Sequence, residues 1–470
     1  MTQLRVAFRT LGCKLNQLEG ESIAQAFLDS GARLVDFDEK AELYVLNTCT
    51  VTGKAEQKAR RSMRQAAAQN PVSVVLVTGC YAQMDPEGLS LVSPRTIVVP
   101  GDEKTSLLRL ADWLSDNWQG HGDLYDAVLE WEVARRSPGG AGESDPFAFH
   151  PRSFVYHSRP SLKVQDGCNN RCAYCRVCIA RGLSRSLDPR IALARAIELE
   201  ASGGREAVLT GVNLSQYRWG EMRFPGLLEF LIANTDSLRF RISSWEPDQV
   251  DEAFLRAFSL PRIQPHLHLS LQSGCDAELR RMGRPYTAAA VAKAVQSLRD
   301  AKDDPFLAAD IISGFPDQTD TEHAQTMELL HSLDLAWIHA FPFSARPGTR
   351  AFDMKPKVPE RLAGERVADL CALAETGRAS YISRWMGRRV PAILEKSSNR
   401  LSGDEVSTSG RGSQGIRHAV SANYLKLGIL GVPEDRAPGS EVMALIQGSS
   451  GRDGVDESLD AEAAWIFGSE

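Results

Sequence analysis

The feature that decides the fold of this chain is a polar loop with three cysteines, Asp166-Gly167-Cys168-Asn169-Asn170-Arg171-Cys172-Ala173-Tyr174-Cys175. The thiols follow C-x3-C-x2-C spacing. Thiolates select zinc, copper(I) or iron-sulfur clusters, and a structural zinc site closes with four ligands. A cubane cluster held by three thiolates keeps one iron open, which is typical of reactive metal sites. The loop therefore predicts an iron-sulfur site with Cys168, Cys172 and Cys175 as ligands.

Two other interpretations of this loop stay open. A zinc knuckle or a chance cluster of buried thiols would contain the same residues. Cys178 also offers a second register, Cys172-x2-Cys175-x2-Cys178, in which four thiolates would close the cluster. We expect Cys178 to lie nearby as a non-ligand, because the first register already supplies three thiolates.

The composition of the 470 residues is that of a folded protein with two or three domains. Hydrophobic residues make up 43% and charged residues 24%, so no large part need be disordered. Neither a signal peptide nor an apolar run of membrane-spanning length is recognisable. We therefore expect a soluble, cytoplasmic protein with no membrane partner, whose nine cysteines bind metal or are buried. The net charge of −6 confines any nucleic-acid surface to a local patch.

A second set of cysteines follows strand-like segments near the N-terminus. Apolar runs at residues 4–8, 43–46 and 74–77 are typical of buried parallel strands, and Cys13, Cys49 and Cys80 come shortly after them. Ligands of open parallel sheets bind beyond the carboxyl ends of the strands. The three thiols are therefore predicted to converge on a second cluster. Three unrelated buried cysteines are the alternative, since free cysteine is often buried.

The middle of the chain alternates between predicted strands and helices. The strands are expected at residues 153–163, 207–212, 238–243, 267–271, 307–312 and 335–340. This pattern predicts a partly closed parallel (β/α)6 barrel with its chemistry at the carboxyl ends of the strands. Asn213, Glu246 and Gln272 follow three of these strands and are candidates for cofactor or substrate contacts, although such side chains also stabilise loops. The sequence singles out no catalytic side chain, and Cys275 and Cys371 are expected in the core.

The C-terminal part changes to short alternating runs at residues 390–394, 406–408, 422–427 and 442–446, which predict a small β-barrel. Between residues 387 and 430, seven cationic side chains face three carboxylates. The cations are Arg388, Arg389, Lys396, Arg400, Arg411, Arg417 and Lys426, and the carboxylates are Glu395, Asp404 and Glu405. A basic β-barrel in an acidic chain is typical of RNA binding. A packing cap on the larger barrel is the alternative.

These observations together predict an α/β protein in three parts. An open parallel α/β domain spans residues 1–131, a linker 132–151, a partial parallel barrel 152–386 and a small β-barrel 387–448. Residues 449–470 form a polar, acidic tail that we expect to be frayed.

Nearly the whole chain resembles the radical S-adenosylmethionine (SAM) methylthiotransferase family. The matching stretches are Leu11-Gly12-Cys13-Lys14-Leu15-Asn16, Asn47-Thr48-Cys49, Gly79-Cys80-Tyr81, the loop of residues 166–175, Leu269-Ser270-Leu271-Gln272-Ser273-Gly274-Cys275-Asp276 and Arg346-Pro347-Gly348-Thr349. The resemblance implies an N-terminal cluster domain, a radical SAM barrel and a C-terminal TRAM domain. It also implies that Cys168, Cys172 and Cys175 hold a SAM-binding 4Fe-4S cluster, and that Cys13, Cys49 and Cys80 hold an auxiliary one.

Within this family, two stretches are most similar to enzymes that act on N6-threonylcarbamoyladenosine beside the tRNA anticodon, Thr10-Leu11-Gly12-Cys13-Lys14 and Phe341-Pro342-Phe343-Ser344. The implied partners are the tRNA anticodon loop and an electron donor such as flavodoxin or ferredoxin. The implied reaction places a methylthio group on adenine C2. Because this C–H bond is unactivated, a radical derived from SAM is required to break it. The auxiliary cluster would supply the sulfur, and a second SAM the methyl group.

The chain departs from the family pattern at three places, Arg176-Val177-Cys178, Asp317-Gln318 and Leu187. All six cysteine positions are retained. Related activities on isopentenyladenosine in tRNA or on an aspartate of a ribosomal protein are alternatives. A non-catalytic iron-sulfur protein that binds RNA is a further one.

Overall fold

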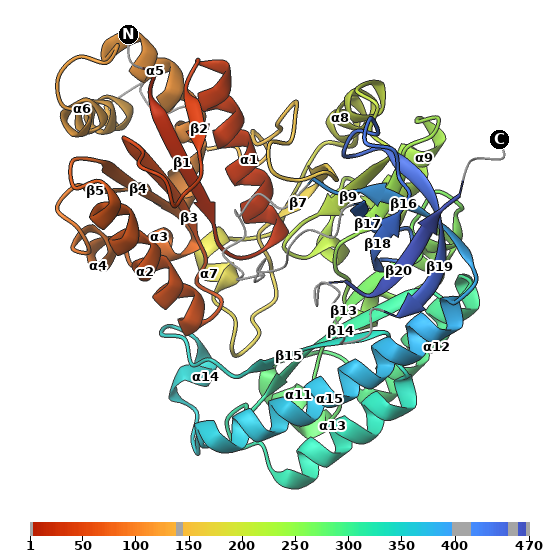
Figure 1. The fold of residues 1–470 in the computed structure, drawn as a ribbon. Helices are drawn as coiled ribbons and strands as arrows, with labels where there is room; N and C mark the ends of the chain where they lie inside the picture. Colours follow the sequence, from red (N-terminus) through yellow and green to blue (C-terminus); the bar gives the residue numbers. More distant parts are fainter. Residues whose placement is uncertain (1–2, 138–143, 397–414, 450–458, 467–470) are drawn as a thin grey trace.

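The structure, a computed structural model, describes residues 3–137, 144–396, 415–449 and 459–466. A parallel sheet with its helices forms the N-terminal part, a strand-and-helix barrel forms the middle, and a small β-barrel packs beside it (Figure 1). The predicted α/β fold in three parts is therefore confirmed. Among the described helices, none combines the length and the apolar composition that a bilayer crossing requires.

The N-terminal sheet contains five parallel strands in the order β2-β1-β3-β4-β5. Their bounds are β1 Arg5–Thr10, β2 Arg33–Val35, β3 Leu43–Thr48, β4 Val74–Gly79 and β5 Thr96–Val98. Strands β3 and β4 are buried along their whole length, which explains their unbroken apolar sequence. The three predicted strands are present, and the two three-residue edge strands were missed. The strand order reverses between β1 and β3, which is where such sheets bind ligands.

Helices cover both faces of this sheet (Figure 1). They are α1 Lys14–Asp29, α2 Gly53–Gln69, α3 Cys80–Met84, α4 Pro86–Ser90, the 3-10 helix η1 Gly101–Arg109, α5 Leu110–Asn117 and α6 Leu124–Arg136. The side chain of Thr52 accepts a hydrogen bond from the Ala55 amide and so begins α2. Residues 132–136, which were predicted within the linker, are the last part of α6.

Six parallel strands form the partial barrel in two sheets, β12-β9-β6 and β13-β14-β15. They are β6 Ser161–Lys163, β9 Glu206–Thr210, β12 Arg239–Ile242, β13 His266–Gln272, β14 Phe306–Ser313 and β15 Trp337–Pro342. A parallel bridge between Trp245 and Leu269 joins the two sheets. The strand prediction holds except at its beginning, because residues 153–160 are irregular and only 161–163 form a strand.

The connections of the barrel are mostly helical. The helices are α7 Val177–Arg181, α8 Pro189–Ala201, α9 Phe224–Ala233, α10 Glu252–Ser259, α11 Asp276–Met282, α12 Ala288–Ala301, α13 Asp320–Leu333, α14 Arg350–Asp353 and α15 Glu360–Trp385, with 3-10 turns η2 Leu214–Gln216 and η3 Pro247–Gln249. Two-residue strands complete the loops, β7 Gln165–Asp166, β8 Arg185–Ser186, β10 Arg218–Trp219 and β11 Met222–Arg223.

The barrel strands separate apolar and polar side chains on their two faces. On β13, Leu267, Leu269 and Leu271 are fully buried in the main hydrophobic core, and His268 alternates with them. The same alternation on the other strands leaves a polar set on the inner face of the barrel, comprising Lys163, Glu206, Arg241, His268, Asp310 and His339. Barrels of this kind usually fill their interior with branched apolar side chains. The inner face here is therefore built for polar contacts.

The C-terminal strands close into a barrel in the order β16-β17-β18-β20-β19. Their bounds are β16 Arg389–Leu394, β17 Ile416–Ser421, β18 Lys426–Leu430, β19 Glu441–Ser449 and β20 Ala461–Trp465. Two predictions were wrong. Residues 422–425, expected in a strand, form the turn between β17 and β18, and β20 lies in the expected frayed tail, where it pairs with β18 and β19. The predicted strand at 406–408 lies outside the described residues.

The turn between β17 and β18 fixes this small barrel to the amino ends of the central strands. Tyr424 has a left-handed backbone, with φ of 67°, and its ring lies 4.0 Å from that of His266. Phe306 packs edge-on against Tyr381 at 5.2 Å, within a core shared by both barrels. The hairpin thus closes the amino end of the central barrel.

The assignment of β20 to the closed barrel can be tested with Ala463→Asp. Ala463 is 1% exposed in the core of the C-terminal barrel, so a carboxylate there should destabilise the barrel by about 2 kcal/mol or more. Thermal unfolding and limited proteolysis would measure this. Glu462→Asp, on the neighbouring half-buried position, is the matched control and should change little. An Ala463→Asp protein that melts like the wild type would refute the placement.

Candidate iron-sulfur sites

The cysteine loop of the central barrel is shaped by glycine and by backbone amides. Gly167 has φ of 71°, and a Cβ there would lie 2.0 Å from the Leu183 carbonyl oxygen, so only glycine fits. The Asn170 amide donates to Cys168 Sγ at 3.4 Å, and the Val177 amide donates to Cys175 Sγ at 3.4 Å. Amide donors of this kind stabilise cluster sulfurs and thiolates. The loop therefore offers the environment that an iron-sulfur cluster needs.

The structure brings the three loop thiols together. Burial raises the pKa of Cys175 to about 12, and the charges of Cys172 and Cys168 contribute further. Thiolate is the form that binds iron, so cluster binding releases these protons. Cys178 is the second residue of α7, and its thiol donates to the Cys175 carbonyl oxygen at 4.0 Å.

Two of the three predicted contact residues gather beside this loop. The Asn213 amide nitrogen lies 3.9 Å from Cys168 Sγ and 3.4 Å from a carboxylate oxygen of Glu246. Arg284 donates to both carboxylate oxygens of Glu246 at 3.0 Å. Burial raises the pKa of Glu246, and Arg284 opposes this effect. Asn213, Glu246 and Arg284 form a polar wall beside the cysteine loop.

The third candidate, Gln272, stands apart from this wall. It ends β13 with a left-handed backbone, φ 69°, and is 7% exposed. A non-glycine residue in this conformation is strained, and such strain concentrates at functional sites. Its position at the carboxyl end of a barrel strand agrees with a contact role.

The N-terminal thiols lie at the carboxyl edge of the sheet, around the switch point. Cys13 precedes α1, Cys49 follows β3 and Cys80 begins α3. Gly12 and Gly79 immediately precede two of them with φ of 100° and 99°. A Cβ on Gly12 would lie 2.8 Å from Cys49 Sγ, so this glycine allows the Cys13 loop to approach Cys49 closely.

These three thiols also act on one another electrostatically. Burial raises the pKa of Cys49 to about 12, and the charges of Cys13 and Cys80 add to the shift. The Val51 amide donates to Cys49 Sγ at 3.5 Å. Within the described residues, no group of three or more His, Cys, Asp or Glu is arranged around a single metal ion.

A buried ionic network joins the two thiol sites. Glu19 of α1 accepts from Lys104 at 2.6 Å, from Lys163 of β6 at 2.8 Å and from Arg181 of α7 at 2.9 Å. Asp166 binds Lys163 at 2.8 Å and Arg181 at 3.2 Å. Burial alone would raise the pKa of Glu19, but the three cations outweigh it and hold the pKa well below its usual range. Three cations face two carboxylates, so the network has room for a further anion.

The N-terminal thiols border this network. Desolvation raises the pKa of Cys13, and the nearby Arg181 opposes this effect. Cys80, Lys104, Lys163 and Arg181 line one cavity of about 310 Å³ between the N-terminal domain and the barrel.

A second bridge involves Arg176, one of the departures from the family pattern. Its guanidinium donates to Thr50 at 3.1 Å and to Glu56 at 3.2 Å, and Arg346 binds the other oxygen of Glu56 at 3.2 Å. Thr50 directly follows Cys49 in the sequence. Arg176 therefore connects the barrel loop with the N-terminal site.

Most of these supporting residues were not predicted from the sequence. Arg284 follows Gly283, which ends α11 in a left-handed conformation. The glycine before it was the local sequence feature that could have drawn attention to Arg284. The sequence around Glu19 contains no such feature, because an acidic residue in an amphipathic helix is ordinarily exposed. Cys275 is buried as expected, whereas Cys371 is exposed on α15, so its predicted place in the core was wrong.

The network predicts a large effect for Glu19→Gln. Loss of the carboxylate would leave Lys163 and Arg181 with Asp166, and Lys104 with the neutral Asn47 amide oxygen. This should destabilise the joint by about 3 to 5 kcal/mol. Thermal unfolding of the reconstituted protein would measure the loss. Glu42→Gln is the matched control, because Glu42 forms a half-exposed pair with Arg5 and should matter little. Equal melting of the two variants would contradict the assigned role of Glu19.

Comparison with known proteins follows the division seen in the structure. Residues 5–100 match a family described as uncharacterized protein family UPF0004, and residues 162–330 match the radical SAM superfamily. The chain is 42% identical over 443 residues to threonylcarbamoyladenosine tRNA methylthiotransferase MtaB of Treponema pallidum, covering 84% of this chain and 92% of the relative. For the protein of the same name in Aquifex aeolicus the identity is 32%, covering 89% and 99%.

A relative with a different name also matches. tRNA-2-methylthio-N(6)-dimethylallyladenosine synthase of Jannaschia sp. is 30% identical and covers 83% of each chain. This chain is an enzyme of the radical SAM methylthiotransferase family, which uses a 4Fe-4S cluster and SAM.

Proposed function

We propose that this enzyme places a methylthio group on C2 of N6-threonylcarbamoyladenosine, next to the anticodon of tRNA. The observation that carries the proposal is the pair of three-thiol sites held together by one buried network, because sulfur insertion needs a sulfur source beside the radical centre. Relatives named for threonylcarbamoyladenosine reach 42% identity, against 30% for the dimethylallyladenosine synthase. This difference supports the threonylcarbamoyl substrate.

The six cysteines divide between two cofactors in this proposal. Cys168, Cys172 and Cys175 hold the SAM-binding cluster, and Cys13, Cys49 and Cys80 hold an auxiliary 4Fe-4S cluster. When bound, these groups supply a radical that can take the unactivated C2 hydrogen, and sulfur to replace it. The polar wall of Asn213, Glu246 and Arg284 would hold and orient SAM beside the cysteine loop.

The remaining requirements are an electron and an accessible base. A one-electron donor such as flavodoxin or ferredoxin would supply the electron in the cytoplasm. An anticodon-loop nucleotide can be splayed out of its stack at modest cost, so the polar inner face of the barrel can receive the base.

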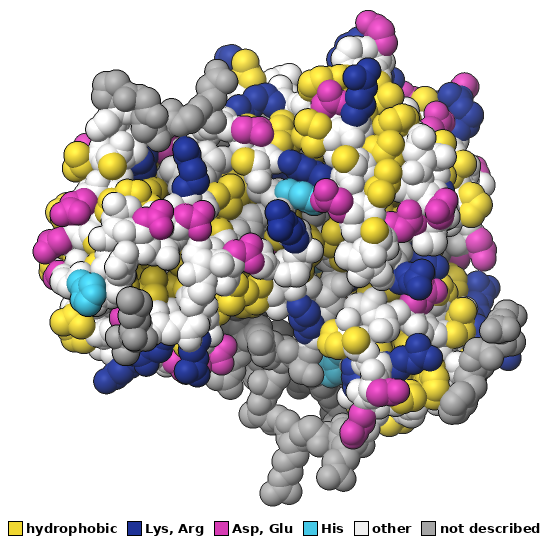
Figure 2. Space-filling model, turned by 90° about the horizontal axis from the view of Figure 1, so that it is seen from above, with side chains coloured by type: hydrophobic (Ala, Val, Ile, Leu, Met, Phe, Trp, Pro, Cys, Tyr) yellow, Lys and Arg dark blue, Asp and Glu magenta, His cyan; other side chains and the backbone are white. Residues whose placement is uncertain are grey.

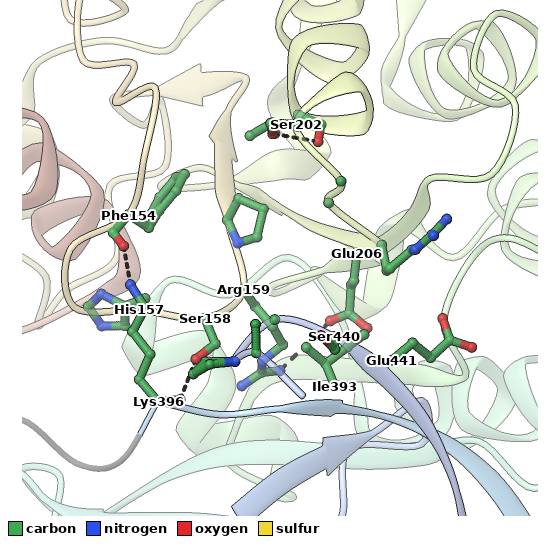
Figure 3. A pocket seen from close by; sticks show the side chains of 18 of the residues that line it. Phe154, His157, Ser158, Arg159, Ser202, Glu206, Ile393, Lys396, Ser440 and Glu441 are labelled. Atoms are coloured by element: carbon green, nitrogen blue, oxygen red, sulfur yellow. Dashed lines mark hydrogen bonds and ion pairs between the residues drawn. The ribbon is translucent and has the colours of Figure 1, made fainter. Parts of the chain in front are cut away.

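A groove of about 930 Å³ provides a surface for the RNA backbone. It lies where residues 152–160, the amino ends of β9 and β12, and strands β16 and β19 meet. The Lys396 ammonium group donates to the carbonyl oxygens of Phe154 and Val155, and the Lys396 backbone amide donates to the Ser158 hydroxyl at 2.6 Å (Figure 3). Seen from above, Lys and Arg side chains lie along the middle of the molecule (Figure 2). The groove walls are thus fixed by contacts between the two barrels.

Only part of the positive charge predicted for the C-terminal barrel is free to bind RNA. Lys396 and Arg417 bond carbonyl oxygens of the protein, and Arg400 and Arg411 lie outside the described residues. Arg152, Arg205 and Arg436 line the groove, are exposed and make no side-chain bond to a described residue. They come from three different segments. These arginines are the proposed phosphate contacts.

The two-cluster proposal predicts the outcome of a Cys13→Ala, Cys49→Ala, Cys80→Ala triple variant. Anaerobically reconstituted wild type should contain about eight irons per chain, and the triple variant about four. Iron and sulfide analysis with Mössbauer spectra would measure this. A single cluster that is unchanged in the triple variant would refute the auxiliary site.

The same two proteins test the substrate. With SAM and a reductant, the wild type should convert a threonylcarbamoyladenosine stem-loop to its 2-methylthio derivative, and the triple variant should not. Nucleoside mass spectrometry would detect the product. Conversion of a dimethylallyladenosine stem-loop in its place would favour the alternative substrate.

The groove predicts the salt dependence of tRNA binding. An Arg152→Ala, Arg205→Ala, Arg436→Ala variant should bind tRNA more weakly and reduce the slope of log Kd against log salt by about 2. Fluorescence anisotropy between 50 and 200 mM salt, roughly the range in which phosphate contacts dominate, would measure it. The control is a triple variant that removes three exposed arginines outside the groove, Arg33→Ala, Arg190→Ala, Arg256→Ala. Its slope should stay close to that of the wild type. Identical slopes for both variants would exclude the groove.

A further inference from the structure

Lys14 occupies an unusual position beside the N-terminal thiols. It directly follows Cys13, begins α1 and is half-buried. Its ammonium nitrogen lies 5.7 Å from the centre of the Tyr424 ring, which closes the amino end of the central barrel. The side chain therefore extends from the proposed sulfur-bearing site toward the barrel interior.

The other cations around Lys14 already have carboxylate partners. Arg241 binds Glu206 at 2.7 Å, and Arg159 binds Glu395 at 3.2 Å. Arg378, whose guanidinium stacks on Trp337, pairs with Asp460. Lys14 forms no ion pair with any carboxylate in the described parts of the chain. Its charge is thus available to a ligand.

The inner face near Lys14 otherwise carries two imidazoles and their partners. His268 lies 3.1 Å from Asp310, and the His268 and His339 rings are 4.9 Å apart. Burial lowers the pKa of His339 to about 4, and the charges of His268 and Lys14 contribute. The imidazole is therefore neutral at pH 7, and Lys14 supplies the positive charge at this place.

A substrate with a carboxylate near its reacting carbon would complement this arrangement. C2 and C6 of adenine flank the same ring nitrogen, so a group on N6 lies close to the carbon that receives sulfur. The threonylcarbamoyl group ends in a carboxylate, whereas a dimethylallyl group is apolar. A carboxylate taken out of water requires a charged partner.

We propose that Lys14 binds the threonyl carboxylate of the substrate and thereby selects threonylcarbamoyladenosine over adenosines whose N6 group is uncharged. This inference rests on the proposed function. A site built to pair a charged group rejects an analogue that lacks it, because the protein group is then left buried without a partner. Lys14 is in this sense a specificity-determining residue and takes no part in hydrogen abstraction.

The experiment compares two RNA stem-loops, one with threonylcarbamoyladenosine and one with the corresponding threoninamide, in which a carboxamide replaces the carboxylate. Wild type should prefer the carboxylate. Lys14→Met should raise KM for the carboxylate RNA about 10- to 100-fold, with a smaller effect on kcat, and should lose the preference. Lys14→Arg should restore most of it. Equilibrium binding without SAM, measured by fluorescence anisotropy, should show the same pattern without turnover.

Iron content is the control for the neighbouring Cys13, and it should be equal in all three proteins. A Lys14→Met enzyme that still prefers the carboxylate would overturn the inference. Equal binding of the two RNAs by the wild type would also overturn the inference, and this outcome does not depend on the stability of the variants. If wild type modifies only dimethylallyladenosine RNA, the proposed function itself fails, and this result is distinct from a failure of Lys14 alone.

Discussion

The relative position of the two thiol sites depends on one buried carboxylate. Glu19 comes from the N-terminal domain, and two of its three cationic partners, Lys163 and Arg181, come from the barrel. If a partner of a buried ion moves away, the ion stays out of water but loses attraction to that partner, and the cost of its desolvation is no longer offset. Displacement of the two domains is therefore unfavourable. The N-terminal domain is therefore held in one orientation. The proposed sulfur transfer between the two sites would require this fixed geometry.

Polar side chains occupy places where an apolar core would give more stability. The inner face of the barrel carries His268, Asp310 and His339, and its amino end is closed by Tyr424 from another domain. Stability comes instead from the outer face, where leucines of the same strands pack under the helices. The alternation of a strand lets one segment serve both purposes.

The sequence was sufficient to predict the α/β fold with an N-terminal parallel sheet, a partial barrel and a C-terminal β-barrel, because apolar runs are local signals. The cysteine spacing also predicted two thiol sites, and the ligand role of these thiols stays a prediction. The sequence was not sufficient where partners are distant. Glu19, Arg181 and Lys14 look like ordinary residues of helices, and their roles follow only from tertiary packing. The turn at residues 422–425 was read as a strand because its apolar side chains face another domain. Strand β20 was missed because its five residues follow a polar, acidic segment.

Strand β20 also determines when the C-terminal barrel can close during synthesis. All six thiols are synthesised by Cys175, whereas the C-terminal barrel cannot close before residues 461–465 leave the ribosome. At 5 to 20 residues per second, roughly 15 to 60 s separate the two events. During this interval the Tyr424 turn is not yet in place against the amino end of the central barrel. The N-terminal domain and the central barrel can therefore fold before the last strand of the C-terminal barrel is added.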